Sequence, residues 1–348
     1  MNQHIVEKRK KSATMEREMS KNIFLVAPNV WRMKDVFVNV FIIQNNHSSN
    51  FVLVDTGLKS SAVKIKKMIA DVLSPAATPM AIVMTHGHFD HRGSIEQLAN
   101  EWRVPVYAHH LELPYLTGKS SYPPADPSVG GGAMASLSFM YPKKPIDVAE
   151  HLEELPQDGS IPGLPEWKWI HTPGHTPGHI SLFREEDGVL VAGDAFVTTK
   201  QESVFSVMTQ KKELCGPPKY FTPDWAAAAR TVKALAALEP NVVTTGHGQS
   251  MYDDEARKGL HKLSKEFWHK GMPANGRYVK EPALFNEDGV TYIPPARTNY
   301  TLLTIIGATA LVGIGYFLYK KKHKSLGKAL MDSSMELLTN SISKASAL

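Results

Sequence analysis

Short runs of apolar and β-branched residues alternate with polar segments along most of the chain. The first three runs predict β-strands at Asn22–Val26, Val36–Ile43 and Phe51–Asp55. Residues 60–72 instead carry apolar side chains at helical spacing, with Val63, Ile65, Met68 and Ile69 on one stripe. The pattern therefore predicts a group of strands followed by an amphipathic helix.

The same alternation continues to residue 270. Further strands are predicted at Ala81–Thr85, Val104–Ala108, Trp167–His171, His179–Phe183, Val189–Ala192 and Asn241–Thr245. Further helices are predicted at Ser94–Trp102, Ala226–Leu238 (with Asp224 as its N-cap) and Met251–Lys270. Strands come in two batches, each followed by helices, and this order predicts an α/β fold of four layers with two sheets inside. Residues 110–165 are rich in Pro, Gly and Ser, which indicates a long functional or disordered loop.

A different pattern begins at residue 300. Residues 300–319 are 20 residues without a charged side chain, and a helix of that length spans roughly 30 Å. Tyrosines lie at both ends, and lysines follow at residues 320–322 and 324. We predict a C-terminal transmembrane helix. The alternative is a buried core helix, which would be expected to show a polar stripe.

The charge of the 348-residue chain is concentrated at its two ends. The formal net charge is +5, but residues 1–21 carry +3 and residues 320–348 carry +4, which leaves −2 for the body. A slightly acidic body argues against a nucleic-acid partner. The single cysteine, Cys215, excludes a disulfide scaffold. The predicted organisation is a basic arm (1–21), a catalytic domain (22–299), a membrane helix (300–319) and a basic, amphipathic tail (320–348).

The densest group of potential metal ligands directly follows the predicted strand Ala81–Thr85. The segment His86-Gly87-His88-Phe89-Asp90-His91 places three imidazoles and a carboxylate within six residues. His86 and His88 point to the same side of an extended chain and can bind one metal together. Asp90 and His91 lie on the turn beyond, where the chain can fold back toward a second metal. A chance cluster on a surface loop would not explain why the cluster ends a buried strand.

Three further candidate ligands also follow predicted strands. They are His175 after Trp167–His171, Asp194 after Val189–Ala192, and His247 after Asn241–Thr245. Each has Gly or Pro neighbours, which allow close backbone approach. Imidazole and carboxylate groups bind zinc, iron and similar ions. Donors from four separate strand ends can therefore converge on one site.

In this order, the residues resemble the motifs of the metallo-β-lactamase superfamily. Val54-Asp55-Thr56-Gly57 resembles the first motif, and His86–His91 resembles the second. His175, Gly193-Asp194 and His247 resemble the third, fourth and fifth. The similarity spans about residues 22–270 and is to bacterial metallo-hydrolases of the glyoxalase II and lactonase type. It implies an αβ/βα sandwich with a two-metal site in the cleft between the sheets.

The resemblance also implies a role for each motif residue. His86, His88 and His175 would bind the first metal. Asp90, His91 and His247 would bind the second, and Asp194 would bridge the two. Asp55 would lie behind the ligands and hold a loop or a ligand in place. Two divalent ions are expected, most plausibly Zn²⁺, with iron or manganese as alternatives.

Such a site implies a metal-dependent hydrolase acting on a small molecule. Metal binding lowers the pKa of water from ~15.7 to about 7, so a metal-bridging hydroxide can attack an ester-like bond in a thioester, lactone or related acyl substrate. Asp90 is the expected proton carrier. The alternatives are a phosphodiesterase or nuclease of the same fold, a mono-iron sulfur dioxygenase and a membrane-tethered binding module.

The position of the enzyme relative to the membrane has two interpretations. The first 21 residues lack the apolar core of a secretory signal. The lysines after residue 319 favour a cytoplasmic C-terminus. We predict membrane anchoring through the C-terminus with the catalytic domain on the cytoplasmic side. The alternative is a segment that lies in the membrane interface.

Overall fold

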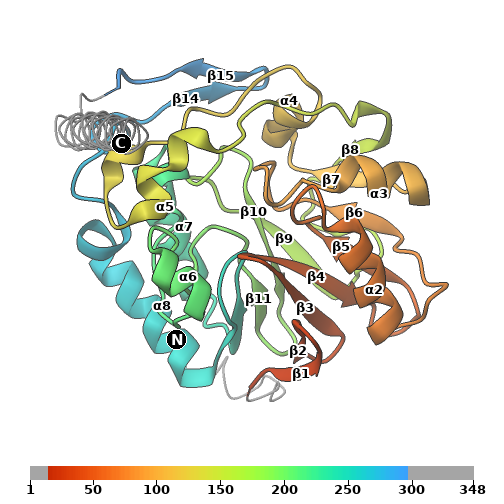
Figure 1. Ribbon diagram of the computed structural model, residues 1–348. Helices are drawn as coiled ribbons and strands as arrows, with labels where there is room; N and C mark the ends of the chain where they lie inside the picture. The colour runs from red at the N-terminus through yellow and green to blue at the C-terminus, as the bar shows by residue number, and fades with distance from the viewer. Residues whose placement is uncertain (1–14, 297–348) are drawn as a thin grey trace, which may run out of the picture. The chain divides into compact units, whose positions relative to one another are not determined.

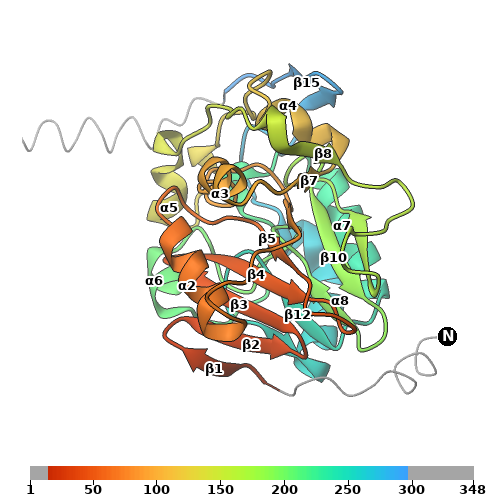
Figure 2. The same cartoon turned by 90° about the vertical axis from the view of Figure 1, so that its right-hand side faces the viewer.

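The architecture is seen in a computed structural model, which describes residues 15–296 (Figures 1 and 2). The first sheet has eight strands, and their spatial order follows the sequence. They are β1 (Arg17–Ser20), β2 (Ile23–Ala27), β3 (Val30–Asp35), β4 (Val38–Gln44), β5 (Phe51–Val54), β6 (Ala81–Val83), β7 (Val106–Ala108) and β8 (Leu152–Glu154). Pairing is antiparallel from β1 to β5 and parallel from β5 to β8.

A second, five-stranded sheet is built from the later part of the chain in the order β13-β12-β11-β10-β9. Its strands are β9 (Trp167–His171), β10 (Ile180–Arg184), β11 (Val189–Val191), β12 (Val242–Thr244) and β13 (Met251–Tyr252). Only β11 and β12 pair in parallel. A separate hairpin is formed by β14 (Leu284–Asn286) and β15 (Gly289–Tyr292).

Helices cover the outer faces of both sheets. The longer ones are α2 (Ala62–Val72), α3 (Ile95–Trp102), α7 (Trp225–Ala237) and α8 (Asp253–Glu266). Short ones are α4 (Leu113–Leu116), α5 (Ala133–Ser136) and α6 (Val204–Thr209), with 3₁₀ turns η1 (His110–Glu112), η2 (Pro127–Val129), η3 (Ser138–Met140), η4 (Ala149–His151) and η5 (Lys219–Phe221), and the π turn η6 (Phe267–Gly271). Asp224 caps α7 as predicted, because its Oδ1 accepts a hydrogen bond from Ala227 N at 2.8 Å.

Three apolar clusters define four layers. α2 and α3 pack on one face of the first sheet, the two sheets pack face to face, and α7 and α8 pack on the outer face of the second sheet. Strand periodicity explains this arrangement. Along β4, Val40 and Ile42 face the helices, whereas Phe41 and Ile43 face the second sheet. The predicted αβ/βα sandwich is therefore confirmed.

The helices and strands of the structure differ from the predicted ones in several places. The strand predicted at Val36–Ile43 begins two residues before β4, because Val36 adopts a positive φ of 58° in the turn between β3 and β4, and β3 itself was not predicted. Strand β1 falls within the stretch predicted as a basic arm, and it pairs with β2 at the edge of the sheet. Residues 110–165 contain α4, α5 and β8 in place of one continuous loop. The helix predicted at Met251–Lys270 begins after β13.

The predicted membrane helix at 300–319 and the tail at 320–348 lie outside the described residues. Within residues 15–296, every helix is too short or too polar to cross a membrane. The fold is thus established for the catalytic body, and membrane anchoring stays a prediction.

Candidate metal centre

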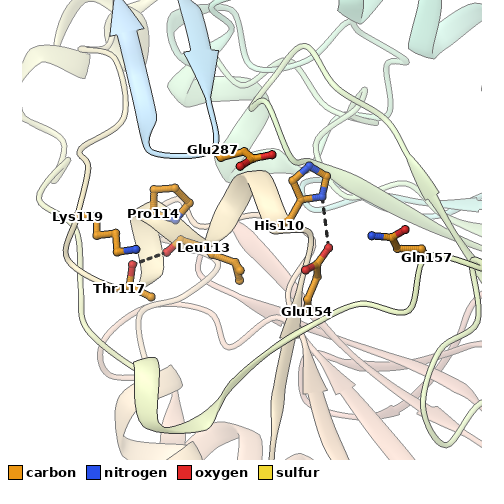
Figure 3. A pocket seen from close by; sticks show the side chains of 8 residues that line it. All are labelled: His110, Leu113, Pro114, Thr117, Lys119, Glu154, Gln157 and Glu287. Carbon is orange, nitrogen blue, oxygen red and sulfur yellow. Dashed lines mark hydrogen bonds and ion pairs between the residues drawn. The ribbon is translucent and has the colours of Figure 1, made fainter.

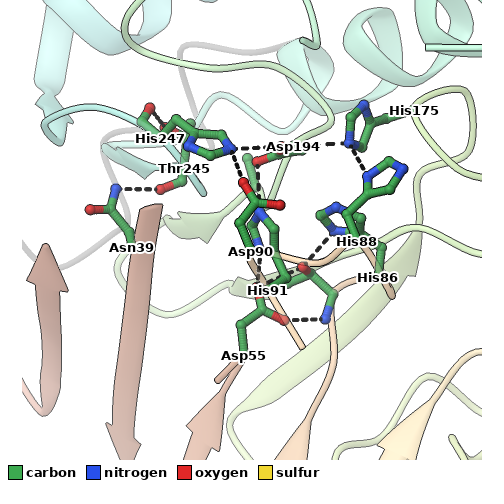
Figure 4. Close-up of polar contacts among 12 residues, drawn as sticks. Asn39, Asp55, His86, His88, Asp90, His91, His175, Asp194, Thr245 and His247 are labelled. Carbon is green, nitrogen blue, oxygen red and sulfur yellow. Dashed lines mark hydrogen bonds and ion pairs between the residues drawn. The ribbon is translucent and has the colours of Figure 1, made fainter. Parts of the chain in front are cut away.

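The predicted ligands lie where strands of the two sheets end. His86, His88, Asp90 and His91 follow β6, His175 follows β9, Asp194 follows β11, and His247 follows β12. The structure brings all seven side chains together (Figure 4). They form a group of three histidines, a group that contains Asp90, and a third group, His86, His91 and Asp194, that overlaps both. Within each group, the potential ligand atoms lie within 4.8 Å of one another.

The first group consists of His86, His88 and His175, all buried. His88 Nδ1 lies 2.9 Å from His175 Nε2, so the two rings present nitrogens to the same point. The second nitrogens of two members are occupied. His86 Nδ1 contacts Thr85 Oγ1 at 3.1 Å, and His175 Nδ1 contacts Thr222 Oγ1 at 3.3 Å. These contacts direct the remaining ring nitrogens inward.

The second group consists of Asp90, His91 and His247. His247 Nε2 lies 3.6 Å from Asp90 Oδ2. The outward nitrogens are again held, because His247 Nδ1 lies 2.7 Å from Phe37 O and His91 Nδ1 lies 2.7 Å from Asp55 Oδ2. This group differs from the first in containing a carboxylate.

Asp194 lies between the two groups. Its Oδ2 is 3.5 Å from His175 Nε2 and 3.1 Å from His247 Nε2, and its Oδ1 is 3.6 Å from His91 Nε2. His179 fixes the backbone here, because its Nε2 accepts a hydrogen bond from Asp194 N at 2.8 Å. A side chain at Gly246 would collide with Asp194 and His91, which explains the glycine before His247.

The side chains fit a bound cation. His86 Nε2, His91 Nε2 and Asp194 Oδ1 are buried and have no hydrogen-bond partner. Leaving a buried polar atom unsatisfied costs about 1–3 kcal/mol. Bound divalent metal ions would satisfy these three atoms, because such ions take imidazole and carboxylate ligands.

The groups also differ in protonation. Burial lowers the pKa of His86 and His88 well below the usual histidine value, and it lowers that of His175 to about 3. These rings are neutral at pH 7 and can donate lone pairs to a metal. Burial opposes the charged form of His91 and His247 too, but the nearby Asp194 carboxylate raises the pKa of both.

Asp55 stands directly behind the ligand segment, at the end of β5. Its Oδ1 accepts a hydrogen bond from Thr85 N at 2.8 Å, and its Oδ2 accepts one from Thr85 Oγ1 at 2.7 Å and contacts His91. Asp55 has a positive φ of 60°, a conformation that most residues avoid. These contacts match the positioning role that its motif implies.

Glu112 is a positioning residue that sequence reasoning missed. Its buried carboxylate accepts hydrogen bonds from Gly87 N and Gly178 N, each at 2.9 Å, from Thr176 Oγ1 at 2.6 Å and from the Tyr122 hydroxyl. Gly87 separates His86 from His88, and Thr176 follows His175. Glu112 therefore joins both segments that carry the first group.

Asn39 on β4 has a corresponding position near His247. Its Nδ2 donates hydrogen bonds to Thr245 O and Gly248 O, both at 2.8 Å (Figure 4 shows the first). Its backbone N donates to Gly246 O at 2.7 Å. The first sheet thus holds the His247 turn of the second sheet. Nothing near Asn39 or Glu112 in the sequence marks either residue, because their partners are distant along the chain.

Two cavities flank this region. One of about 590 Å³ is lined by Phe89 and Arg92 of the ligand segment and by apolar residues including Leu58 and Ile146. The other, of about 440 Å³, lies near α4 and the β14–β15 hairpin, where His110 Nδ1 is 3.5 Å from Glu154 Oε1 (Figure 3). None of the seven predicted ligands lines either cavity. The first is lined by Phe89 and Arg92, which flank Asp90 and His91 in the sequence.

Comparison with known proteins decides the family. A model described as the metallo-beta-lactamase superfamily matches residues 33–247, from β3 to the last predicted ligand. The chain belongs to the metallo-beta-lactamase superfamily. Probable metallo-hydrolase YflN of Bacillus subtilis (strain 168) is 47% identical over 242 residues, which are 69% of this chain and 92% of that protein. Probable metallo-hydrolase YybB of the same organism is 26% identical over 208 residues, covering 59% and 80%.

The solved structures to which this chain is similar include the crystal structure of TTHA1623 in a di-iron-bound form. It is 26% identical, covers 65% of this chain and 96% of that chain, and has a TM-score of 0.44. The predicted superfamily and the predicted class of metal-dependent hydrolase are confirmed. The donor groups and the superfamily point to divalent metal ions as cofactors.

Proposed function

We propose that this chain is a hydrolase that uses two divalent metal ions, with Zn²⁺ as the proposed metal, to cleave an ester-like bond in a thioester, lactone or related acyl substrate. The observation that carries the proposal is the convergence of seven donor side chains around buried atoms that lack hydrogen-bond partners. When bound, such ions supply Lewis acidity and a water molecule activated at neutral pH.

In this proposal, His86, His88 and His175 hold the first ion. Asp90, His91 and His247 hold the second. Asp194 serves both, which agrees with its contacts to members of each group. Burial opposes the charged form of Asp194, but His247 and His91 hold its pKa well below the usual range, so it stays a carboxylate. Thr85, Thr222, Asp55 and Phe37 orient the histidine rings.

Asp90 is the residue we propose to carry a proton. Burial raises the pKa of its carboxyl group above the usual value, which makes protonation of Oδ2 easier during turnover. Its other neighbours, His91 and His247, favour the charged form.

The cavity beside the ligand segment favours an acyl substrate. Phe89, Leu58 and Ile146 give it apolar walls, and Arg92, which is only 5% exposed, adds positive charge together with Lys59 and Lys144. An apolar acyl group fits such walls by burial of its surface.

We also propose that residues 300–319 anchor the enzyme in the membrane with its catalytic domain on the cytoplasmic side. The uncharged stretch and the lysines after it favour this.

The function is tested by a hydrolysis screen on the full chain in detergent. Thioesters, lactones, phosphodiesters and β-lactams are offered, and metal content is measured on the same sample. We expect about two divalent ions per chain and turnover of the acyl substrates. His88→Ala and Asp90→Asn should each reduce turnover by more than about 100-fold. His47→Ala is the control, because that side chain is 81% exposed.

Three outcomes would contradict the proposal. They are a protein that binds no metal, cleavage confined to phosphodiesters, or a single bound iron with consumption of O₂. Membrane anchoring is tested separately by protease digestion of intact cells. Digestion of the catalytic domain from outside would contradict the cytoplasmic orientation.

A further inference from the structure

Exposed apolar side chains gather on two neighbouring short segments. They comprise Leu137 (49% exposed), Phe139 (63%) and Met140 (68%) around η3, and Phe205 (69%) and Met208 (76%) on α6. We call these five residues the apolar face. Both ribbon views place α5, which leads into η3, beside α6 (Figures 1 and 2). Met134 N donates a hydrogen bond to Glu202 O at 3.2 Å, which ties the two segments together.

The apolar face is not part of the protein core. Its five members belong to none of the three buried clusters and contribute nothing to the packing of the sheets within residues 15–296. Single exposed apolar residues are common, but a group on adjacent segments marks a contact surface for a protein or a membrane. Gly132 allows the two segments to approach closely, because any side chain at this position would collide with the Glu202 backbone.

Positive charges flank both parts of the face. Lys143 and Lys144 follow η3, and Lys211 and Lys212 follow α6. Lys211 and Lys212 form ion pairs with Glu213 and Glu255 at 3.8 and 3.7 Å. Such exposed pairs are weak and are readily exchanged for other anions. Aromatic and Met side chains bordered by lysines are the composition of surfaces that lie in the headgroup region of an anionic bilayer.

The membrane anchor proposed above would tether the described domain to a bilayer by a short connection. Residue 296 is the last described, and the uncharged stretch begins at residue 300. Four residues span at most about 14 Å. In both ribbon views, the described chain leaves β15 on the side of the molecule that carries α5 (Figures 1 and 2).

We propose that the apolar face docks the catalytic domain on the surface of an anionic lipid bilayer. The proposal rests on the membrane anchor proposed above. It goes beyond anchoring because it fixes which side of the catalytic domain meets the lipid.

Aromatic contacts connect the apolar face with the metal centre. Tyr141 follows Met140, and its ring centroid lies 5.8 Å from those of Phe89 and Phe221. Phe221 in turn stacks on His88 at 4.5 Å. Docking therefore places the metal centre next to the bilayer, with apolar rings between the two. The substrate class that follows is an acyl compound dissolved in the membrane, with a chain long enough to reach along these rings.

Docking is measured on the full chain reconstituted in vesicles of phosphatidylcholine and phosphatidylglycerol. An environment-sensitive fluorophore is attached to Met208→Cys or to Val63→Cys. Val63 is the matched control, since it is 71% exposed and lies on α2, outside the five residues of the apolar face. The native Cys215 interferes little, because burial raises the pKa of its thiol to about 12. We expect spin-labelled lipid to quench the probe at position 208 and to leave the probe at position 63 unquenched.

Each other result contradicts docking in a distinct way. If the chain floats with vesicles while both probes stay unquenched, the anchor holds and the docking proposal is wrong. If the chain does not float, both membrane proposals are wrong. Shielding of position 208 without lipid indicates that residues 300–319 or a second copy of the chain cover the face. None of these readouts requires turnover, so they are independent of the proposed hydrolysis.

The substrate class is tested with Phe205→Ser/Met208→Ser. We expect hydrolysis of long-chain acyl substrates in vesicles to fall by about tenfold or more, because apolar burial is lost. Metal content and hydrolysis of short, water-soluble esters should match the wild type. Equal loss on both substrates would contradict the proposed role of the face.

Discussion

The three-histidine group and the group with Asp90 lie side by side but are fixed by different parts of the molecule. Glu112, from η1, holds the backbone on both sides of the first group through Gly87, Thr176 and Gly178. Asp55 and Asn39, from the first sheet, hold the second group through His91 and the turn around His247. Each half thus has a main supporting side chain of its own, and Asp55 also reaches the first group through Thr85.

The two halves also differ in charge. The first contains only imidazoles, whose pKa values are lowered by burial. The second contains Asp90 and lies next to Asp194, which raises the pKa of His91 and His247. If each half binds an ion as proposed, an ion in the first half would meet neutral ligands, whereas an ion in the second half would compete with protons. The comparison then predicts that the two ions are lost separately.

A substitution of Asp194 is expected to weaken metal binding in both halves. Asp194→Asn takes a carboxylate from both halves at once, so we expect metal affinity of both and turnover to fall by more than about 100-fold. Metal content and hydrolysis are measured together. Asp254→Asn, on an exposed carboxylate (66%), is the matched control. Retention of either ion at normal affinity would show that Asp194 does not serve both halves.

The variant Asp55→Asn tests whether the second half can be weakened more than the first. In Asp55→Asn, one oxygen can still accept from Thr85 N, but an amide faces His91 and disturbs its orientation. We expect the affinity of the second half to fall by about 10–100-fold. A smaller loss is expected in the first half, because Thr85 Oγ1 also contacts His86. NMR of the histidine ring nitrogens during metal titration distinguishes the halves. A larger loss in the first half would contradict this assignment.

Protonation of Glu112 gives the first half a pH dependence of its own. Burial raises the pKa of Glu112 to about 7, against 4.5 for an ordinary glutamate. The stabilisation from its bound proton is complete below about pH 4.5 and is lost as the pH rises through 7. In metal-free protein, this loss amounts to roughly 3 kcal/mol. Urea unfolding from pH 5 to 8 should show it in the wild type and not in Glu112→Gln. Parallel pH profiles would contradict the assignment.

Much of the fold was predictable because its strands are apolar runs with clear boundaries. Trp167–His171 coincides with β9, and the Asp224 cap marks the start of α7. Strand β8 and the β14–β15 hairpin were missed because they are short and largely exposed or half-buried. The turn at Val36 was missed because its residue is apolar and was joined to the run that follows. Strand β3 was missed although it is buried, because Arg32, Lys34 and Asp35 interrupt its apolar pattern.

The candidate ligands were predictable because their motifs are local. His86 to His91 lie within six residues, and each later ligand has Gly or Pro beside it. Glu112 and Asn39 were not predictable in this way. Asn39 contacts residues more than 200 positions away, and Glu112 contacts Gly178 across 66 positions. Residues that position a site from a distance require the tertiary structure to be recognised.

The central claim is that separate side chains hold the two halves of the metal centre. It is tested most directly by titrating metal-free Glu112→Gln with Zn²⁺ against a competing chelator, with histidine ring NMR to identify the half that binds. Its amide cannot accept from all four donors that contact Glu112. We predict that affinity falls by about 10–100-fold at His86, His88 and His175. The affinity at Asp90, His91 and His247 should stay within about threefold of the wild type. An equal loss in both halves, or no loss in either, would contradict the account.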